Sequence, residues 1–377
     1  MKLGIFESVY GQYPFDVAAK KIKEAGFDYI QFNPYWANGQ NISPDSITKS
    51  KANKIRDTFE KEGIKIVGIG SYGCFVSPDL DVKNKIIDDT KKWIKLAKEF
   101  GTDVVVTEVG SKHATNNWTD CANNKTKKTW KEVVEVYKEL TEYAKKFNVN
   151  VAIEPHFGQV VKNAKDLRKL LDDVAASNLK IAYDAANSVN ADNVDIQEEA
   201  VDEFFQLLCN DIILVHAKDA QVKNNNTEFV PAGQGVIPYR KLLNKLKAQG
   251  YEGPILLEWV EENNVQEAKD YIEEQGTLPF LIPLLKADKE LFNNANQALE
   301  LVHSSEGALD LKYRLLLSMV ADALTRHPAG AVACGREAIE AGATKEEVTE
   351  AIRVVYTAGG LTSLIENFDL YREVILK

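Results

Sequence analysis

Short apolar runs alternate with amphipathic stretches along the first 275 residues, and this alternation constrains the fold more than any other feature of the chain. Short apolar runs are typical of buried β-strands, whereas apolar residues spaced three and four apart are typical of α-helices. We expect strands at residues 2–6, 28–32, 65–69, 103–108, 150–154, 180–184, 211–216 and 254–258. We expect helices at residues 14–25, 46–62, 82–100, 126–147, 163–175, 195–208, 237–249 and 263–274. Eight strand–helix units close a barrel, so the sequence predicts an α/β fold of the (β/α)8 TIM barrel type.

Local signals agree with these boundaries. Gly26, Gly63, Gly101 and Gly250 each follow a predicted helix, where glycine commonly ends it, and Asp79 precedes one as an N-cap. The alternative α/β arrangement is an open doubly wound sheet, which more often has about five or six strands. No Gly-x-Gly-x-x-Gly motif follows the first predicted strand. The barrel is therefore favoured over the open sheet.

The chain changes character after Gln275-Gly276. Residues 280–377 contain no strand-like run, and all five tryptophans precede them. We expect a small all-α domain with helices at residues 280–286, 288–302, 310–325, 328–341, 344–358 and 361–375. The predicted domains are residues 1–275 and 276–377. Amphipathic helices of this kind often bury their apolar faces between subunits, so we expect a homo-oligomer assembled through this helical tail.

Composition excludes several classes of function. The formal net charge of −10 disfavours nucleic acid as a partner, so we expect a small, sugar-like molecule instead. No apolar stretch is long enough for a membrane span, and the amino terminus begins a strand where a signal peptide needs an apolar core. We therefore expect a cytoplasmic protein without a membrane partner. The four cysteines are isolated, which argues against a disulfide framework or a thiolate zinc site.

A polar residue ends each of the last four predicted strands of the barrel. These residues are Glu154, Asp184, His216 and Glu258, separated by 30, 32 and 42 positions. Because parallel strands joined by crossover helices all point the same way, their carboxyl ends converge. Three carboxylates and one imidazole suit Mn²⁺, Co²⁺ or Mg²⁺, and Zn²⁺ is the alternative. The competing interpretation is structural, since an acid at a strand end can cap a helix or pair with a lysine.

Five segments around these residues resemble the xylose isomerase-like barrel superfamily of sugar isomerases, epimerases and myo-inositol-pathway enzymes. The segments are residues 152–156 (AIEPH), 182–184 (AYD), 215–219 (VHAKD), 233–235 (GQG) and 250–258 (GYEGPILLE). The resemblance covers about residues 1–275. It implies that Glu154, Asp184, His216 and Glu258 bind the metal. It also implies that two of them, Glu154 and Glu258, are the catalytic acid and base, moving a proton beside a carbonyl through a metal-bound enediolate.

Four further residues are candidates for binding the substrate. His156 and Lys218 each lie two positions after a predicted ligand and should share its face of the strand. Structural alternatives are a hydrogen-bonded histidine at the barrel mouth and a lysine paired with Asp219 or another acid. Glu108 ends the fourth strand, and Asn187 follows the third-last strand of the barrel. Glu7 follows the first strand, where capping of a helix is the simpler interpretation.

The chain departs from the ketose epimerases of this superfamily at two places. Those enzymes often carry histidine where Asn187 stands and glutamate where Val160 stands. The departures leave open a dehydratase or lyase acting on a cyclic polyol ketone or sugar acid, and a sugar-binding module without catalysis. Zinc-dependent apurinic endonucleases share the barrel but need about three metals and more histidines than this chain has, and its acidity argues against DNA.

The tail resembles a second family. Residues 309–360, and above all the turn 341–347 (AGATKEE), are similar to the carboxymuconolactone decarboxylase family, which includes alkylhydroperoxidase partner proteins. The places of the redox cysteine pair, its histidine and a glutamate hold His327, Gly330, Cys334 and Leu315. A dithiol cycle needs two sulfurs, so the usual peroxidase route is not expected. Decarboxylation or lactone chemistry in the tail remains an alternative, with Cys334 as a small buried hydrophobe the simpler interpretation.

Overall fold

The computed structural model describes residues 2–303 and 307–376. The chain forms two compact units, Met1–Gly276 and Thr277–Lys377, and each is described by itself. Within the described residues, no helix combines the length and the apolar character that crossing a membrane requires.

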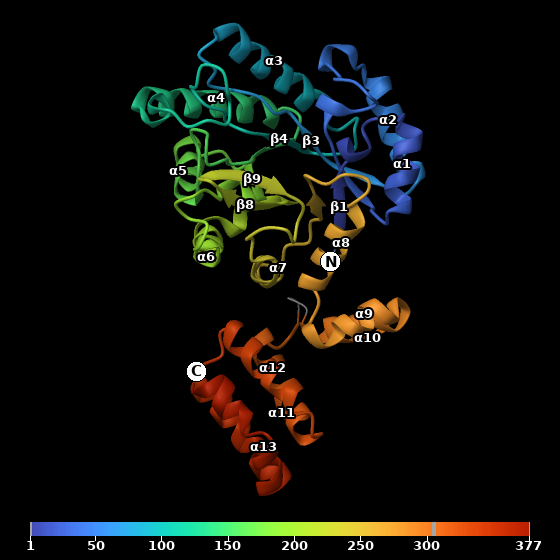
Figure 1. Cartoon of the computed structure of the whole chain (residues 1–377), viewed down its shortest axis with the longest axis vertical. Coiled ribbons are helices and arrows are strands. Elements are labelled where there is room, and N and C mark those ends of the chain that lie inside the picture. Colours follow the sequence, from blue (N-terminus) through green and yellow to red (C-terminus); the bar gives the residue numbers. More distant parts are fainter. Residues whose placement is uncertain (1, 304–306, 377) are drawn as a thin grey trace. The chain divides into compact units, whose positions relative to one another are not determined.

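The first unit is a closed barrel of eight parallel strands (Figure 1), so the predicted (β/α)8 fold is confirmed. Neighbouring strands follow the order β1-β10-β7-β6-β5-β4-β3-β2. Their bounds are β1 Leu3–Phe6, β2 Tyr29–Phe32, β3 Lys65–Gly70, β4 Val104–Thr107, β5 Asn150–Ile153, β6 Leu179–Asp184, β7 Ile212–Ala217 and β10 Ile255–Leu257. All eight predicted strands are present, with ends shifted by at most one residue.

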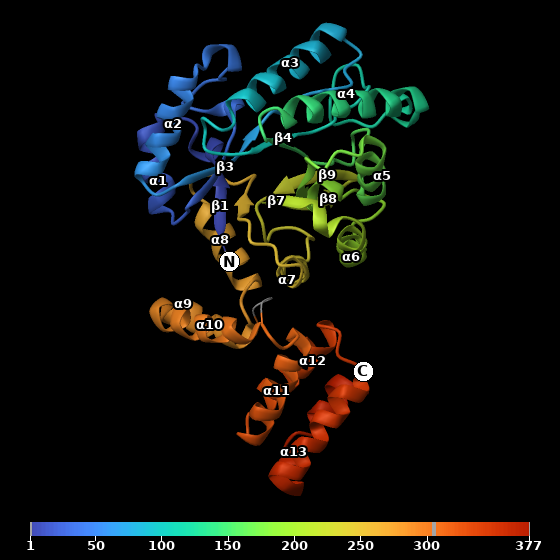
Figure 2. The ribbon, with the colours of Figure 1, turned by 180° about the vertical axis from the view of Figure 1, so that it is seen from behind.

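Helices α1 to α8 lie around the barrel strands (Figure 2). They are α1 Phe15–Glu24, α2 Lys49–Lys61, α3 Leu80–Leu96, α4 Lys127–Lys145, α5 Ala164–Val174, α6 Gln197–Leu208, α7 Tyr239–Ala248 and α8 Val265–Gln275. Asp79 caps α3 as expected, its carboxylate accepting hydrogen bonds from two backbone N–H groups. The helix predicted from residue 46 begins later, because residues Pro44–Ser46 form a short 3-10 turn and Thr48 is the N-cap of α2.

Alternate strand positions fill the inside of the barrel. Ala152, Ala182, Leu214 and Leu256 belong to one buried interior cluster. The strand residues between them belong to the larger core that also contains the helix faces: Val151, Ile153, Ile181, Val215, Ile255 and Leu257. Because side chains two positions apart share a face, the next inward positions toward the carboxyl ends are 154, 184, 216 and 258. The apolar interior thus ends in a polar layer at the mouth.

A β-hairpin that was not predicted follows β7. Its strands β8 (Asp219–Lys223) and β9 (Asn226–Val230) pair antiparallel. Asn224 and Asn225 form the two-residue turn, both with positive φ, which asparagine tolerates better than most residues. The two asparagines, which favour such turns, were the feature of the sequence that could have indicated the hairpin. The hairpin matters because β9 supplies a ring that contacts the site described below.

The second unit is helical, as expected. Its helices are α9 Ile282–Ala287, α10 Lys289–His303, α11 Leu311–Leu324, α12 Pro328–Glu340 and α13 Lys345–Glu366, followed by a π-helical turn at Tyr371–Ile375. Thr344 and Glu347 form a capping box at the start of α13, within the turn at 341–347. Gly360, with φ 75° and ψ −175°, kinks α13 at the boundary between the helices predicted at 344–358 and 361–375. The predicted helix at residues 361–375 ends earlier, at Glu366.

Candidate metal centre and active site

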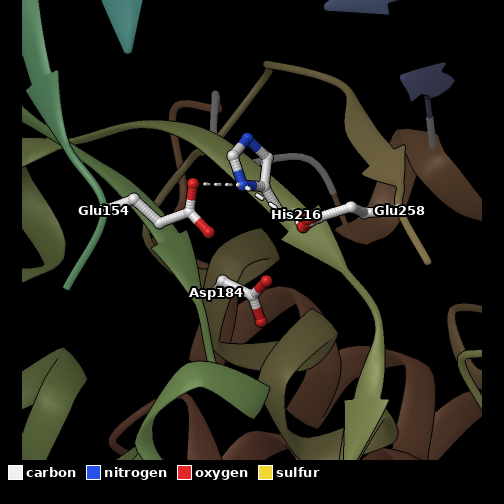
Figure 3. A group of neighbouring side chains, drawn as sticks. All are labelled: Glu154, Asp184, His216 and Glu258. Carbon is white, nitrogen blue, oxygen red and sulfur yellow. Dashed lines mark ion pairs between the residues drawn. The ribbon is translucent and has the colours of Figure 1, made fainter. Parts of the chain in front are cut away.

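Four polar side chains at the carboxyl ends of neighbouring strands converge inside the barrel mouth (Figure 3). Glu154 follows β5, Asp184 ends β6, His216 lies in β7 and Glu258 follows β10. One potential ligand atom from each lies within 4.8 Å of the other three. Asp184 and His216 are almost wholly buried, and Glu154 is 6% exposed. The structure therefore brings together the four residues that the sequence analysis selected as ligands.

The imidazole of His216 is held by residues that the sequence analysis missed. Its Nε2 donates to the side-chain oxygen of Gln31 at 2.9 Å. The amide of Gln31 donates to the hydroxyl of Tyr72, which in turn donates to Glu154 at 2.9 Å. Phe6 packs edge-on against the imidazole, with ring centres 4.9 Å apart. With Nε2 carrying the proton, the lone pair of Nδ1 faces the carboxylates. Gln31 is the one polar residue in the run of β2, which was a signal for its role.

The donor atoms fit a divalent cation. Nδ1 of His216 is buried without a hydrogen bond and lies 3.3 Å from Glu154 Oε2 and 3.9 Å from Glu258 Oε2. Asp184 Oδ2 is buried without a hydrogen bond of good geometry, although the ammonium of Lys218 lies 2.9 Å away. A metal–oxygen bond of about 2.1 Å places opposite ligands about 4.2 Å apart, close to the observed spread. Three oxygen donors and one nitrogen are the set that Mg²⁺, Mn²⁺, Co²⁺ and Zn²⁺ accept.

Lys218 is the cation that faces this acidic group. Its Nζ lies 2.9 Å from Asp184, 3.0 Å from Glu258 and 3.8 Å from Glu154. The ammonium also lies 4.8 Å from the centre of the Phe229 ring on β9. Lys218 is 4% exposed. With the carboxyls ionised and the imidazole neutral, three acids and one lysine leave a net charge of −2, which a divalent cation would neutralise.

The pKa values of the two predicted catalytic glutamates are shifted in opposite directions from the ordinary value of a glutamate. Burial raises the pKa of Glu258 to about 7, against the attraction of Lys218 and with the help of the neighbouring Glu154. Burial also raises the pKa of Glu154, but in the metal-free site the positive charges of protonated His216 and of Lys218 outweigh it and lower the pKa to about 2. Two carboxyls whose surroundings separate their pKa values are a typical acid–base pair. In the metal-free site Glu258 is thus the weaker acid of the two.

Asn187 and His156 flank Glu154 in different ways. The amide of Asn187 donates to Glu154 Oε1 at 2.6 Å, so it orients the carboxylate. His156 accepts a hydrogen bond from the backbone N–H of Gly158 at Nδ1 and stacks on Phe157. Burial, together with Lys218, lowers the pKa of His156 to about 4, so this imidazole is neutral near pH 7. In the described part of the chain, no hydrogen bond joins His156 to Glu154.

Two expectations about neighbouring loops need correction. Glu7 does not cap a helix, because both of its carboxyl oxygens are buried without a hydrogen bond. Asp219 does not pair with Lys218. Its carboxylate instead accepts from the backbone N–H groups of Ala220, Gly233 and Ile237, at 2.9 to 3.1 Å. The glycine-rich loop at 233–235 therefore folds around a carboxylate of the chain itself, which occupies the donors that an anionic ligand would use.

Comparison with known proteins decides the family. A family model described as xylose isomerase-like TIM barrel matches residues 19–278, more than half of the chain. The chain belongs to the xylose isomerase-like TIM barrel family. The model of the carboxymuconolactone decarboxylase family matches residues 289–369. Both resemblances found in the sequence are confirmed.

One relative of this xylose isomerase-like protein is the uncharacterized protein MJ1311 of Methanocaldococcus jannaschii. The two are 25% identical over 288 residues, which span 72% of this chain and 90% of the relative. The match carries no activity to transfer, because the relative is itself uncharacterized.

Three solved structures illustrate the range of proteins with the same barrel. A xylose isomerase-like protein from Mycobacterium smegmatis in complex with magnesium is 18% identical, with a TM-score of 0.57 over 73% of this chain and 96% of that one. The 3-keto-D-glucoside 4-epimerase of E. coli is 15% identical, with a TM-score of 0.56 over 72% and 99%. The probable 3-DHS dehydratase of Bacillus anthracis is 19% identical, with a TM-score of 0.56 over 74% and 99%. At such identities the likeness establishes the fold alone.

The tail of this xylose isomerase-like protein places its polar residues around Asp322. Sγ of Cys334 lies 3.8 Å from Asp322 Oδ2, and Nδ1 of His327 lies 3.4 Å from Asp322 Oδ1. Leu315 is buried in the core of the tail. Gly330 lies beside His327 and Asp322, with no room for a larger side chain. A single cysteine next to a carboxylate lacks the partner sulfur and the positive surroundings that make a thiol reactive.

Cys334 is therefore expected to react slowly with alkylating reagents. Burial, followed by the nearby Asp322 and Glu337, raises the pKa of the thiol to about 12, so almost no thiolate exists near pH 8. Mass spectrometry should show iodoacetamide labelling of Cys334 at least about tenfold slower in the native protein than in the urea-unfolded chain, where the thiol regains an ordinary pKa near 8.5. Equal rates in the two states would mean that the thiol is activated.

Proposed function

We propose that the barrel is a divalent-metal-dependent isomerase or epimerase of a small sugar or polyol-derived carbonyl compound. The observation that carries the proposal is the group of Glu154, Asp184, His216 and Glu258, in which two glutamates from different strands share one candidate cation position with an aspartate and an imidazole. Reactions of this kind need a base that removes a proton beside a carbonyl and an acid that returns one. Mn²⁺, Co²⁺ and Mg²⁺ suit the donor set, with Zn²⁺ as the alternative.

Each residue then has a defined task. The carboxylate of Glu154 takes the proton from the carbon beside the carbonyl, and the electrons of the broken C–H bond form the double bond of an enediolate. Glu258, on another strand, would supply a proton that it takes from solvent. In an epimerase this proton goes to the other side of the same carbon; in an isomerase it goes to the former carbonyl carbon, and the hydroxyl proton moves to the former carbonyl oxygen. Asn187 and Tyr72 hold Glu154 in place. A cation held by the four ligands would stabilise the negative charge that develops on the carbonyl oxygen.

A dehydratase acting on a cyclic polyol ketone or sugar acid is the second candidate. It uses the same first step, since a proton leaves the carbon beside the carbonyl before a hydroxide leaves the next carbon. Asn187 and Val160 favour it, because they replace the histidine and glutamate that many ketose epimerases carry. A dehydratase is also among the proteins that share this barrel.

Incorporation of deuterium from D₂O tests the proposal. The full-length protein, loaded with Mn²⁺ or treated with chelator, is incubated with ketoses, inososes and sugar acids, and the products are analysed by mass spectrometry. We expect metal-dependent gain of deuterium by at least one carbonyl compound, with loss of water identifying a dehydratase. No exchange with any compound would contradict proton transfer and leave a sugar-binding module as the better account.

A further inference from the structure

Glu108 extends the polar layer of the barrel to a fifth strand. It follows β4, where Val104 and Val106 belong to the interior cluster, so position 108 shares their inward face. The adjacent β5 ends at the same level, because the backbone N–H of Glu154 donates to Thr107 O at 2.8 Å. Glu154 and Lys218 lie close enough to influence the pKa of Glu108, which burial raises to about 7. Glu108 is therefore a neighbour of the catalytic pair.

One carboxyl oxygen of Glu108 accepts two hydrogen bonds, and the other accepts none. Oε2 accepts from the indole N–H of Trp118 at 2.8 Å and from the amide of Gln159 at 2.7 Å. The amide oxygen of Gln159 is itself fixed by the backbone N–H groups of Val109 and Gly110. This network holds the carboxyl rigidly. Oε1 is buried and has no hydrogen bond.

A purely structural role does not account for this arrangement. The helix that follows β4 is α4, and its N-cap is Thr126. Anchoring Trp118 and Gln159 requires only Oε2, whereas an unpartnered buried oxygen destabilises the fold. Asp184 Oδ2 and His216 Nδ1, which face the candidate metal position, are also buried without a hydrogen bond. Oε1 of Glu108 is thus buried without a hydrogen bond, like the two atoms that face the candidate metal position.

Resting on the proposed function, we propose that Glu108 is a specificity-determining residue that binds a hydroxyl of the substrate through Oε1. Trp118 and Gln159 are positioning residues that aim the carboxyl. The substrate is accordingly a polyhydroxylated compound. One of its hydroxyl-bearing carbons lies next to the carbons between which Glu154 and Glu258 move a proton. A simple keto acid or aldehyde without that hydroxyl would leave Oε1 buried and unpaired, and such sites reject the ligand that lacks the matching group.

Calorimetric titration of the Mn²⁺-loaded full-length protein with xylitol and myo-inositol tests this assignment without turnover. We expect at least one of these polyols to bind. Glu108→Met, which has no hydrogen-bonding atom, should weaken binding by about tenfold or more, whereas Glu108→Gln, which can still pair with a hydroxyl, should remain within about threefold of the wild type. Trp118→Phe removes one of the two hydrogen bonds that position the carboxyl, so it should weaken binding, but less than Glu108→Met does, because Oε1 and the bond from Gln159 remain. Mn²⁺ affinity should be similar in all four proteins.

Three results would overturn the assignment. They are the absence of binding by both polyols, equal binding by Glu108→Met and wild type, and equal losses in Glu108→Met and Trp118→Phe, which would indicate a structural role. These results are independent of the deuterium experiment, because a protein that binds polyols through Glu108 but exchanges no proton contradicts only the proposed function. Thermal unfolding of each variant shows whether the barrel is folded.

Discussion

Replacing Glu258 with glutamine is expected to lower proton exchange between substrate and solvent by about 10²–10⁴-fold, the usual contribution of positioned proton transfer. The amide keeps an oxygen at the position of a ligand atom but cannot carry a proton at neutral pH. Glu258 is suited to the role because its carboxylate lies in the same group as Glu154, Asp184 and His216, beside the candidate cation position. Deuterium incorporation, measured with excess Mn²⁺ so that weaker metal binding is compensated, gives the rate.

Glu261→Gln is the matched control for this variant. Glu261 lies three positions later in the same loop and is exposed, so the same chemical change there should leave the exchange rate unaltered. If Glu258→Gln exchanges protons as fast as the wild type, Glu258 is not part of proton transfer. If both variants lose exchange equally, the loop and not the carboxyl is responsible.

Replacing Lys218 with methionine is expected to destabilise the metal-free barrel by about 3–5 kcal/mol, because removal of one partner leaves buried charges without compensation. Lys218 contacts three carboxylates and is 4% exposed. Urea unfolding followed by tryptophan fluorescence measures the effect in the barrel alone, since all five tryptophans precede residue 280. A bound divalent cation supplies the missing positive charge, so the loss should shrink when Mn²⁺ replaces chelator.

Lys223→Met is the control for the lysine. Lys223 ends β8, and its ion pair with Glu228 is more than half exposed on both sides, so its loss should cost only about 0–1 kcal/mol. A small effect of Lys218→Met in the presence of chelator would contradict the account of Lys218 as the internal counter-ion. An effect that Mn²⁺ does not reduce would indicate that the cation binds elsewhere.

The sequence predicts the barrel well because its information is local and periodic. Each strand is a short apolar run, and the step of two residues that puts Ala152 and Leu256 inside also aims Glu154 and Glu258 at the mouth. Four separate predictions of strand ends therefore suffice to assemble the ligand group. The family resemblance adds the chemistry, which spacing alone does not supply.

The parts that were not predicted depend on contacts between distant positions. Gln31 and His216 are 185 residues apart, and Tyr72 and Glu154 are 82 apart, so no local pattern connects them. The partner of Lys218 was uncertain for the same reason, since the adjacent Asp219 turns away to bind backbone N–H groups of the next loop. Each of these contacts depends on the closed barrel, which brings positions far apart in the sequence together.

Metal content is the most direct test of the central claim that these four side chains form a divalent-metal site. Elemental analysis of the purified full-length protein after equilibration with Mn²⁺ and gel filtration should give about one ion per chain. The same analysis of His216→Ala should give a small fraction of that value, because the nitrogen donor is lost. No bound metal in the wild type, together with unchanged thermal stability on chelation, would contradict the claim.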